Sequence, residues 1–453
     1  MTVTDPAPSA TRPLMALDFG GLIVGLGPTM ESGIRPVTLG ARRPALILGP
    51  TQIGKTSCIV IPNVLSAPGA VVSTSTKPDV LRATASWRKK IGTCFHFDLT
   101  GDTTNVDGVT PLHWSPVIGC EDPNRAEDIA DAIAAAARPY ARNSESAHWV
   151  ERSKAWLAPC FHAAAIAGHT MATVAKWVWT HDIREVQAIL SAMGGSDIQR
   201  ASLSGIIRTD ERERSGILST AAGLLSPYRN DAVLRAACTP NFDADHFAAS
   251  YDTVYVTAPA DKQDQLAPLV VALLDQIKNA VYRRHLKSPD AAPVVFALDE
   301  AANIAPLPKL PAIASEGGGQ GLLLLVAIQD LSQARARWGE QADGFFTLFP
   351  VKILFPGVAD PRTLELVSSL GGEVAVPMVS TNLPNPLASL TGKGFASTTH
   401  SYTWRRRLPV DAVSEGSQGT ALCHESGKPL RYVMTVPWDR VPEWSRRGST
   451  APR

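Results

Sequence analysis

The chain has 453 residues, of which 45% are hydrophobic and 19% are charged, and its formal net charge is +1. A chain of this length and composition can bury a large core, so we expect a globular protein that divides into two or more units. The near-zero net charge excludes wholesale electrostatic attraction to nucleic acid or to an anionic membrane. Any contact with DNA must therefore come from local patches or from an assembled ring.

The cysteines and the apolar runs indicate a cellular compartment. The six cysteines are widely separated and include no C-x-x-C pair, which argues against a zinc site and against a disulfide framework. No apolar run approaches the length of a membrane span, and the first residues lack the basic start and apolar core of a signal peptide. We therefore expect a cytoplasmic protein with no transmembrane segment in this chain.

The first hundred residues show an alternation of strands and helices. A Gly-rich apolar segment at 19–25 predicts edge strands. From residue 44 onwards the pattern gives an apolar strand at 45–48, a strand at 70–73, a helix from Asp79 and a strand at 94–98. This alternation predicts an α/β fold with a mostly parallel sheet.

Between the first of these strands and its helix lies the motif Gly-Pro-Thr-Gln-Ile-Gly-Lys-Thr, which matches G-x-x-x-x-G-K-[ST]. Gly49 and Gly54 let the backbone curl so that its N–H groups point at a β-phosphate, which then lies at the start of the helix. We expect Lys55 to reach the β- and γ-phosphates of ATP, and the Thr56 hydroxyl to coordinate Mg²⁺. The alternative is a Gly-rich turn that carries a lysine by chance. The predicted nucleotide-binding set is Gly49, Pro50, Thr51, Gln52, Ile53, Gly54, Lys55, Thr56 and Ser57.

The pattern changes between about residues 118 and 235. Ala-rich amphipathic stretches such as 126–137 and 150–167 dominate, separated by Gly or Asn-Asp breaks. These features predict an inserted all-helical subdomain. The α/β pattern resumes with a strand at 253–257 and a long helix whose apolar residues lie between 266 and 281.

An apolar strand at 294–298 ends in two carboxylates, Asp299 and Glu300, at the edge of the sheet where α/β proteins place their ligands. Asp299 has the position of a Walker B aspartate and would hold the water shell of Mg²⁺. Glu300 is placed to act as the general base on the attacking water. The alternative is a pair of acids that solvate a strand-to-loop junction, and the upstream phosphate-binding loop favours the catalytic interpretation.

A further apolar strand at 322–328 ends in Gln329. In P-loop ATPases with a glutamate base, an extra strand lies between the P-loop strand and the Walker B strand, and its polar tip senses the γ-phosphate. Gln329 fits that role, and a surface amide at a strand end is the alternative.

The last third of the chain contains a predicted strand at 351–355, a Pro/Ser/Thr/Gly-rich segment at 377–398 that predicts a long mobile loop, and a terminal hairpin of 419–423 with 431–434. Arg405, Arg406 and Arg407 follow His400, Tyr402 and Trp404. Such a cluster can stack bases and neutralise phosphates. A charged edge beside the hairpin is the blander interpretation and is favoured by the sequence alone.

This arrangement resembles the type IV secretion coupling proteins, the VirD4/TraG-like ATPases of conjugation. The resemblance covers residues 40–440 and depends on the early Gly-Pro-Thr P-loop, the helical insertion, the segments 298–304 and 328–333, and the shorter segments 73–79 and 336–340. It implies a RecA-like motor core of the FtsK/HerA class that works as a ring, with six subunits expected. It also implies ATP hydrolysis coupled to the movement of single-stranded DNA and its relaxase towards a secretion channel.

The resemblance divides the chain into parts and suggests partners. The expected parts are an N-terminal segment with edge strands (1–43), the P-loop part of the nucleotide-binding domain (44–117), an inserted all-α domain (118–235), the remainder of the nucleotide-binding domain (236–445) and a tail (446–453). The expected partners are single-stranded DNA, relaxase and relaxosome proteins, and components of the secretion channel. Family members commonly begin with transmembrane helices, so docking at the inner face of the cell membrane would here need a separate anchor protein.

Two questions stay open from the sequence. The loop at 314–321 has no arginine where relatives often carry one, and Arg335 and Arg337 are the candidates to act on a neighbour's nucleotide, with solvated helix arginines as the alternative. The rival functions are a soluble FtsK/HerA-like DNA translocase of a mobile element, and a nucleotide-dependent module that recruits a relaxase or effector without translocation.

Overall fold

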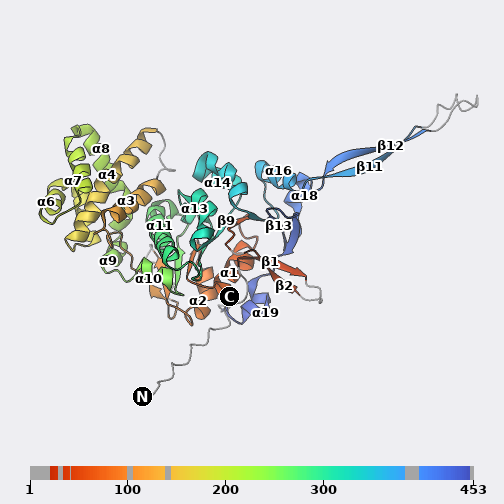
Figure 1. Ribbon diagram of the computed structural model, residues 1–453, viewed down its shortest axis with the longest axis horizontal. Helices are drawn as coiled ribbons and strands as arrows, with labels where there is room; N and C mark the ends of the chain where they lie inside the picture. The colour runs from red at the N-terminus through yellow and green to blue at the C-terminus, as the bar shows by residue number, and fades with distance from the viewer. Residues whose placement is uncertain are drawn as a thin grey trace, which may run out of the picture.

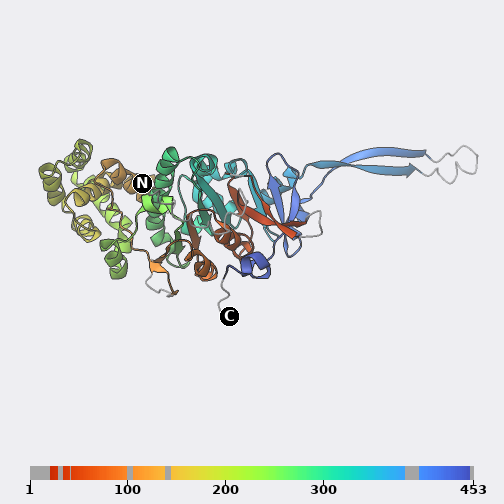
Figure 2. The same ribbon diagram turned by 60° about the horizontal axis from the view of Figure 1, so that its bottom comes forward.

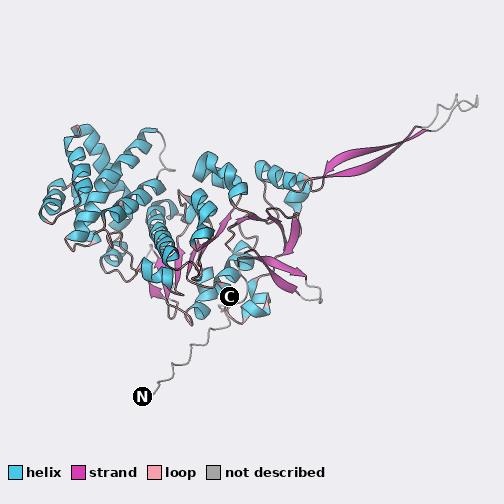
Figure 3. Ribbon diagram, viewed as in Figure 1, coloured by secondary structure: helices cyan, strands magenta, loops and turns pink. Residues whose placement is uncertain are grey.

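A computed structural model of the chain describes residues 21–28, 34–40, 42–98, 106–137, 144–382 and 397–448. These residues form a large sheet with helices on both faces, a group of helices at one end of the molecule and a two-stranded ribbon that projects from the other end (Figures 1 and 2). The colouring by secondary structure in Figure 3 shows that the end opposite the ribbon consists of helices. No described helix is both long and apolar enough to cross a bilayer.

The sheet has 12 strands among the described residues, in the order β2-β1-β14-β13-β10-β3-β9-β8-β4-β7-β5-β6. The pairs from β10 to β6 are parallel, and β13, β14, β1 and β2 extend the sheet with antiparallel pairs. The strands are β1 (Ile23–Pro28), β2 (Ile34–Thr38), β3 (Ala45–Leu48), β4 (Val71–Ser75), β5 (Cys94–Asp98), β6 (Thr110–Pro111), β7 (Thr253–Thr257), β8 (Val294–Leu298), β9 (Leu322–Ile328), β10 (Val351–Leu354), β13 (Thr420–Glu425) and β14 (Arg431–Met434). The predicted α/β fold with a mostly parallel sheet is thus confirmed.

The central strands are apolar throughout because both faces of the sheet are covered. Leu46 and Leu48 of β3 lie in one buried cluster, whereas Ala45 and Ile47 lie in a second cluster on the other face. The β9 strand separates β3 from β8, as the sequence predicts for an ATPase with a glutamate base.

Helices and turns of helix connect the strands and cover both faces. They are η1 (Thr56–Val60), α1 (Ile61–Ser66), α2 (Asp79–Arg88), α11 (Gln263–Lys287), α12 (Ala301–Ile304), α13 (Leu310–Glu316), η4 (Gly317–Gln320), α14 (Leu331–Trp338), η5 (Gly339–Gly344), α15 (Phe345–Leu348), α16 (Pro361–Leu370), α18 (Val410–Glu415), η6 (Trp438–Arg440) and α19 (Pro442–Ser445). The long α11 is buried on most of its surface, because it lies between the sheet and the helical end of the molecule.

The regular elements described between β6 and β7 are all helical. Its elements are α3 (Pro123–Ala137), α4 (Ser144–Ile166), α5 (Met171–Thr180), α6 (Ile183–Ala192), α7 (Asp197–Arg208), α8 (Glu211–Leu224), η3 (Ser226–Arg229), α9 (Asp231–Cys238) and α10 (Ala244–Ala249). Trp156 and Trp177 are fully buried among these helices and belong to the same apolar cluster as Leu46. The helical region and one face of the sheet therefore share a continuous core, and the domain boundaries drawn from the sequence remain a prediction.

One expectation for the chain's connections changes. The predicted loop at 377–398 begins as strand β11 (Glu373–Asn382) and ends in strand β12 (Ser397–Arg406), which pair antiparallel to form the projecting ribbon. The loop prediction was wrong at 377–382 and at 397–398 because composition hides the strand pairing, and residues 383–396 lie outside the described part. The sequence also predicts edge strands at 19–25. Residues 19 and 20 lie outside the described part, and β1 and β2 form one end of the sheet.

Candidate functional site

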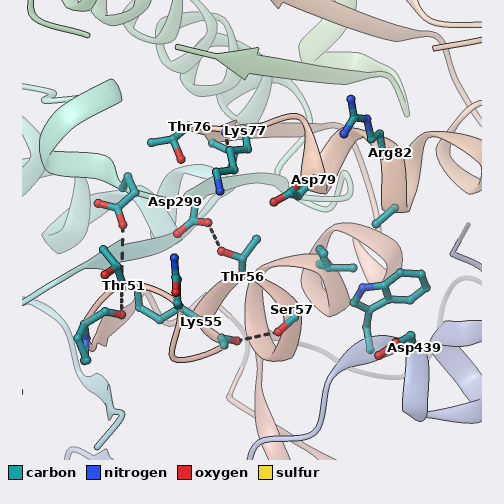
Figure 4. A pocket seen from close by; sticks show the side chains of 18 residues that line it. Thr51, Lys55, Thr56, Ser57, Thr76, Lys77, Asp79, Arg82, Asp299 and Asp439 are labelled. Carbon is teal, nitrogen blue, oxygen red and sulfur yellow. Dashed lines mark hydrogen bonds and ion pairs between the residues drawn. The ribbon is translucent and has the colours of Figure 1, made fainter. Parts of the chain in front are cut away.

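A pocket of about 840 Å³ lies at the carboxyl ends of β3, β4 and β8. Its wall comes from four stretches of the chain: the P-loop, the turn from β4 into α2, the residues after β8, and the start of η6. Figure 4 shows side chains from these stretches pointing towards one another across the pocket.

The P-loop is held at its start by the end of the neighbouring strand β9 and at its end by the first turn of the helix that follows it. Gly49 N–H donates to Gln329 O at 3.0 Å, and Cys58 N–H donates to Gly54 O at 2.8 Å. Gly54 has φ of +101°, a backbone conformation that L side chains rarely adopt, which explains the glycine of the motif at this position. The helix begins with one π-helical turn, η1, and continues as α1.

Lys55 lies over the loop and is only 5% exposed. Its Nζ donates to Gly49 O at 2.5 Å and to Pro50 O at 3.0 Å, and lies 4.0 Å from Glu300 Oε1. Burial lowers the pKa of Lys55, and the carboxylates of Glu300 and Asp299 partly oppose that shift. The ammonium is thus desolvated and is held by carbonyls at the mouth of the loop.

Asp299 connects the P-loop to the end of β8. Thr56 Oγ1 donates to Asp299 Oδ2 at 2.5 Å, and Thr74 Oγ1 of β4 donates to Asp299 O at 2.9 Å. Burial raises the pKa of Asp299 to about 6, although the Thr56 hydrogen bond and Lys55 act in the opposite direction. Its second carboxylate oxygen, Oδ1, is buried and has no hydrogen-bond partner among the described residues.

Glu300 follows in a strained backbone conformation. Its φ and ψ are 51° and 44°, in the left-handed region, and it precedes the short helix α12. This sharp turn at the strand end directs consecutive carboxylates into one pocket. Glu300 Oε2 is buried and, like Asp299 Oδ1, has no hydrogen-bond partner in the described part of the chain.

The predicted site residues are only partly brought together. Lys55, Thr56, Asp299 and Glu300 line one pocket, whereas Gln329 does not line it. Gln329 is half-buried, and its backbone carbonyl accepts the hydrogen bond from Gly49 of the P-loop. Its own N–H donates to Gln333 Oε1 at 2.8 Å. The remaining predicted P-loop residues that line the pocket are Pro50, Thr51, Gln52, Gly54 and Ser57, and Ile53 lines a neighbouring one.

Arg335 and Arg337 lie on α14 and are engaged within the chain. Arg335 Nη2 lies 3.0 Å from Asp360 Oδ1, and Arg337 Nε donates to Ala302 O at 2.6 Å. Arg337 Nη2 also lies 3.9 Å from Asp264. Both arginines therefore already have partners within the chain, and any role at a neighbouring subunit would have to accommodate these contacts.

The structure adds pocket residues that sequence reasoning did not assign to the site. Ser75, Thr76, Lys77, Asp79 and Arg82 come from the turn after β4 and the first turns of α2. The resemblance to coupling proteins includes the segment 73–79, so a signal for this wall exists in the sequence.

A second wall, made of Trp438 and Asp439, has no signal in the sequence. It is positioned by the last helical turns: Trp444 Nε1 donates to Ser66 Oγ at 3.2 Å, and Arg447 Nη1 donates to Leu65 O at 3.5 Å. These contacts fix the C-terminal segment on α1, more than 370 residues earlier in the chain.

The fold and the pocket together define a RecA-like α/β protein with a P-loop at the carboxyl edge of its sheet. The chain belongs to the family of type IV secretory system conjugative DNA transfer proteins, whose family model matches residues 12–408.

Individual relatives are similar to parts or most of this chain. The conjugal transfer protein TraG of Escherichia coli is 25% identical over 319 residues, which are 64% of this chain and 49% of TraG. Protein VirD4 of Rhizobium radiobacter is 21% identical over 364 residues, which are 76% of this chain and 50% of VirD4. The chain spans about half the length of the curated relatives it matches.

Solved structures show the same fold. The unbound bacterial conjugative coupling protein TrwBdeltaN70 superimposes with a TM-score of 0.65 at 17% identity, covering 90% of this chain and 88% of that one. The plasmid coupling protein TrwB in complex with the non-hydrolysable ATP analogue ADPNP gives a TM-score of 0.65 at 17% identity, covering 89% and 88%. TrwB has also been solved with ADP and Mg²⁺.

Proposed function

We propose that this protein is an ATP-hydrolysing coupling protein that links a DNA–relaxase substrate to a type IV secretion channel and drives single-stranded DNA transfer in conjugation. The observation that carries the proposal is the meeting of Lys55, Thr56, Asp299 and Glu300 in one pocket at the carboxyl edge of the sheet. Membership of the conjugative DNA transfer family supplies the biological process.

The unpartnered polar atoms of the pocket fit a nucleotide with its metal ion. Asp299 Oδ1 and Glu300 Oε2 are buried without a partner among the described residues, and such carboxylate oxygens suit Mg²⁺ and its water shell. Among the described residues, the Lys55 ammonium is held by two backbone carbonyls and by a carboxylate 4.0 Å away, so a phosphate would be a stronger partner. Complexes of the similarly folded TrwB with ADPNP and with ADP and Mg²⁺ support this choice of ligands.

We assign one role to each side chain of the site. Lys55 binds the β- and γ-phosphates, Thr56 and, through water, Asp299 hold the magnesium ion, and the N–H groups of residues 49–57 bind the phosphate oxygens. When bound, Mg²⁺ neutralises charge that develops on the phosphates. Glu300 accepts the proton of the attacking water, and Gln329 senses the γ-phosphate from the tip of β9.

The wider proposal concerns assembly and partners. The nucleotide lies at the edge of the sheet, and Arg335 or Arg337 would stabilise transition-state charge on a neighbouring subunit's nucleotide in a ring, which we take to be a hexamer. Relaxosome proteins and single-stranded DNA are the proposed cargo, and components of the secretion channel are the proposed partners at the inner face of the membrane.

The test is steady-state ATP hydrolysis by the purified chain with and without single-stranded DNA, over a range of protein concentrations. We expect DNA to stimulate hydrolysis increasingly as the protein concentration rises. Glu300→Gln should lower the rate by about 10²- to 10⁴-fold, because the general base is lost while the shape of the side chain is kept. Glu340→Gln, an exposed glutamate outside the pocket, serves as the matched control.

Each alternative outcome identifies a rival. Nucleotide binding with slow hydrolysis that is insensitive to DNA would indicate a recruitment module that translocates nothing. DNA-stimulated hydrolysis with no binding to a relaxase or to channel components would indicate a DNA translocase of a mobile element.

A further inference from the structure

The ribbon β11–β12 is a sheet of two strands that projects from the body of the molecule in both views (Figures 1 and 2). Its ten residue pairs run from Glu373 with Arg406 to Asn382 with Ser397. A two-stranded ribbon without a covering layer is marginally stable in water. A ribbon of this length therefore indicates a surface that a binding partner covers when the protein functions.

One face of the ribbon carries a row of rings. His400, Tyr402 and Trp404 occupy alternate positions of β12, so their side chains point to the same face about 6.7 Å apart along the strand. Their cross-strand partners are Val379, Pro377 and Ala375. These partners are too small to cover the rings, and Tyr402 and Trp404 are 73% and 67% exposed.

The outer edge of β12 adds hydrogen-bond donors to this row. Pro377 has no N–H, so its pair with Tyr402 is of the non-hydrogen-bonded kind, in which the backbone groups point away from the partner strand. Pairs of this kind alternate along a ribbon, so the N–H groups of His400, Tyr402 and Trp404 face the free edge. Such N–H groups donate to phosphate oxygens in nucleic-acid complexes.

The charge of the ribbon favours a polyanion. Its described residues from 373 to 407 include three arginines, no lysine and one acidic residue, Glu373. Arg406 is held at the base of the ribbon by Glu365 of α16 at 2.5 Å, whereas Arg405 and Arg407 are exposed. Arg405 pairs with Val374 on the face opposite the rings, so a strand lying along the β12 edge can contact the rings and this guanidinium together.

We propose that the β12 edge of the ribbon binds single-stranded nucleic acid, with bases stacked on Trp404, Tyr402 and His400 and phosphates held by the edge N–H groups, Arg405 and Arg407. Stacking on aromatic rings beside arginines tolerates any base sequence. Pro377 and the like charges of the three arginines disfavour the rival occupant, a ribbon from a second copy of this chain. The inference rests on the proposed function for the identity of its partner.

The experiment measures binding of the 453-residue chain to a fluorescent oligothymidylate by anisotropy, without ATP. The oligonucleotide should exceed the roughly 4–16 nucleotides that such sites commonly occupy. We expect Trp404→Ala and Tyr402→Ala each to weaken binding about tenfold. Tyr432→Ala on β14 removes a ring that is 56% exposed away from the ribbon and should leave binding unchanged.

The arginines are tested through salt dependence. The double substitution Arg405→Gln and Arg407→Gln should reduce the slope of log affinity against log salt by about 0.7 for each charge. Arg208→Gln, an exposed arginine on α7, is the control.

Three results would overturn the proposal: no binding of the oligonucleotide by the unaltered chain at low salt, ribbon variants that bind as tightly as the unaltered chain, or weakened binding that parallels loss of self-association in sedimentation velocity. The last result would show that the ribbon holds copies of the chain together. Binding of a fluorescent ATP analogue, measured on the same samples, separates failure of the ribbon from failure of the nucleotide site.

Discussion

Thr56 Oγ1 donates a hydrogen bond of 2.5 Å to Asp299 Oδ2, and these residues are 243 positions apart in the chain. The contact joins the start of the P-loop helix to the end of β8, so the two oxygens that we assign to magnesium binding are already adjacent. The site is thereby preorganised by one hydroxyl group, which makes Thr56 the most direct test of the assignment.

We expect Thr56→Ala to lower magnesium-dependent ATP hydrolysis by about 100-fold or more, because a metal ligand is lost. Thr56→Ser keeps the hydroxyl and should retain most of the activity. Ser57→Ala removes a hydroxyl that contacts Gly54 O at 3.3 Å and Cys58 Sγ at 3.7 Å but no proposed metal ligand, and should have a smaller effect than Thr56→Ala. The measurement is the steady-state rate against magnesium concentration, and equal rates for the Ala and Ser variants at position 56 would contradict the assignment.

The raised pKa of Asp299 has consequences for stability. Its folded-state pKa of about 6 lies above the ordinary aspartate value of 3.8, so its contribution to stability is present below about pH 4 and is lost as the pH rises through 6. Asp299→Asn removes this dependence. Between pH 4 and pH 7, the unfolding free energy of the nucleotide-free variant should thus rise by up to about 3 kcal/mol relative to that of the unaltered chain.

Urea unfolding of both proteins at a series of pH values measures this gain. Asp261→Asn, an exposed aspartate, should show no such trend. A gain for Asp299→Asn that is the same at pH 4 and pH 7 would be inconsistent with a buried, proton-binding carboxyl. Because magnesium competes with that proton, magnesium-dependent nucleotide binding should also weaken below pH 6.

Glu300, which we propose as the general base, has an unfavourable backbone conformation with φ of 51°. Residues with a Cβ pay of order 1 kcal/mol for the left-handed region, and glycine does not. We expect Glu300→Gly to match or exceed the stability of the unaltered chain by up to about 1 kcal/mol while ATP hydrolysis is lost. Thermal unfolding beside a hydrolysis assay checks this, and Glu300→Ala should be inactive without the gain in stability.

Arg88 is fully buried and acts as a structural cross-link. Its guanidinium donates to Thr253 Oγ1 at 2.7 Å and to the carbonyls of Gly69 and Tyr251, each at 2.8 Å. Arg88→Met should cost about 3–5 kcal/mol of unfolding free energy, because these buried acceptors lose their donor. Arg88→Lys should recover only part of this unfolding free energy, because an ammonium cannot donate to the same set of acceptors as the planar guanidinium.

Denaturant unfolding of the two Arg88 variants gives these values, with Lys89→Ala, at the exposed position directly after α2, as control. A loss below about 1 kcal/mol for Arg88→Met would mean that water or neighbouring groups replace the guanidinium.

Much of the pocket that we assign to the nucleotide could be predicted because its structural requirements are local. Gly49, Gly54, Lys55 and Thr56 lie within eight residues between a strand and a helix, so the loop geometry follows from the order of residue types. The Asp299–Glu300 pair was predictable because five buried apolar residues before it leave few alternatives to a central strand. The position of β9 between β3 and β8 followed from the glutamate-base pattern.

Gln329 illustrates the limit of such reasoning. The sequence places it at a strand end, and the structure joins its carbonyl to Gly49 while leaving it out of the pocket wall. Which way its side chain turns depends on contacts across neighbouring loops, so its role as a sensor stays a prediction.

The sequence by itself determined the α/β class, the strand–loop–helix unit of the P-loop and the carboxylates at the end of β8, since each depends on apolar periodicity and on backbone demands within a few residues. Only the tertiary structure decided that Trp438 and Asp439 close the pocket and that residues 373–382 and 397–406 form a ribbon with exposed rings. Both features depend on pairing and packing between segments that are far apart in the chain. The free energy that stabilises them comes from surfaces that meet only after folding, so no local sequence pattern indicates them.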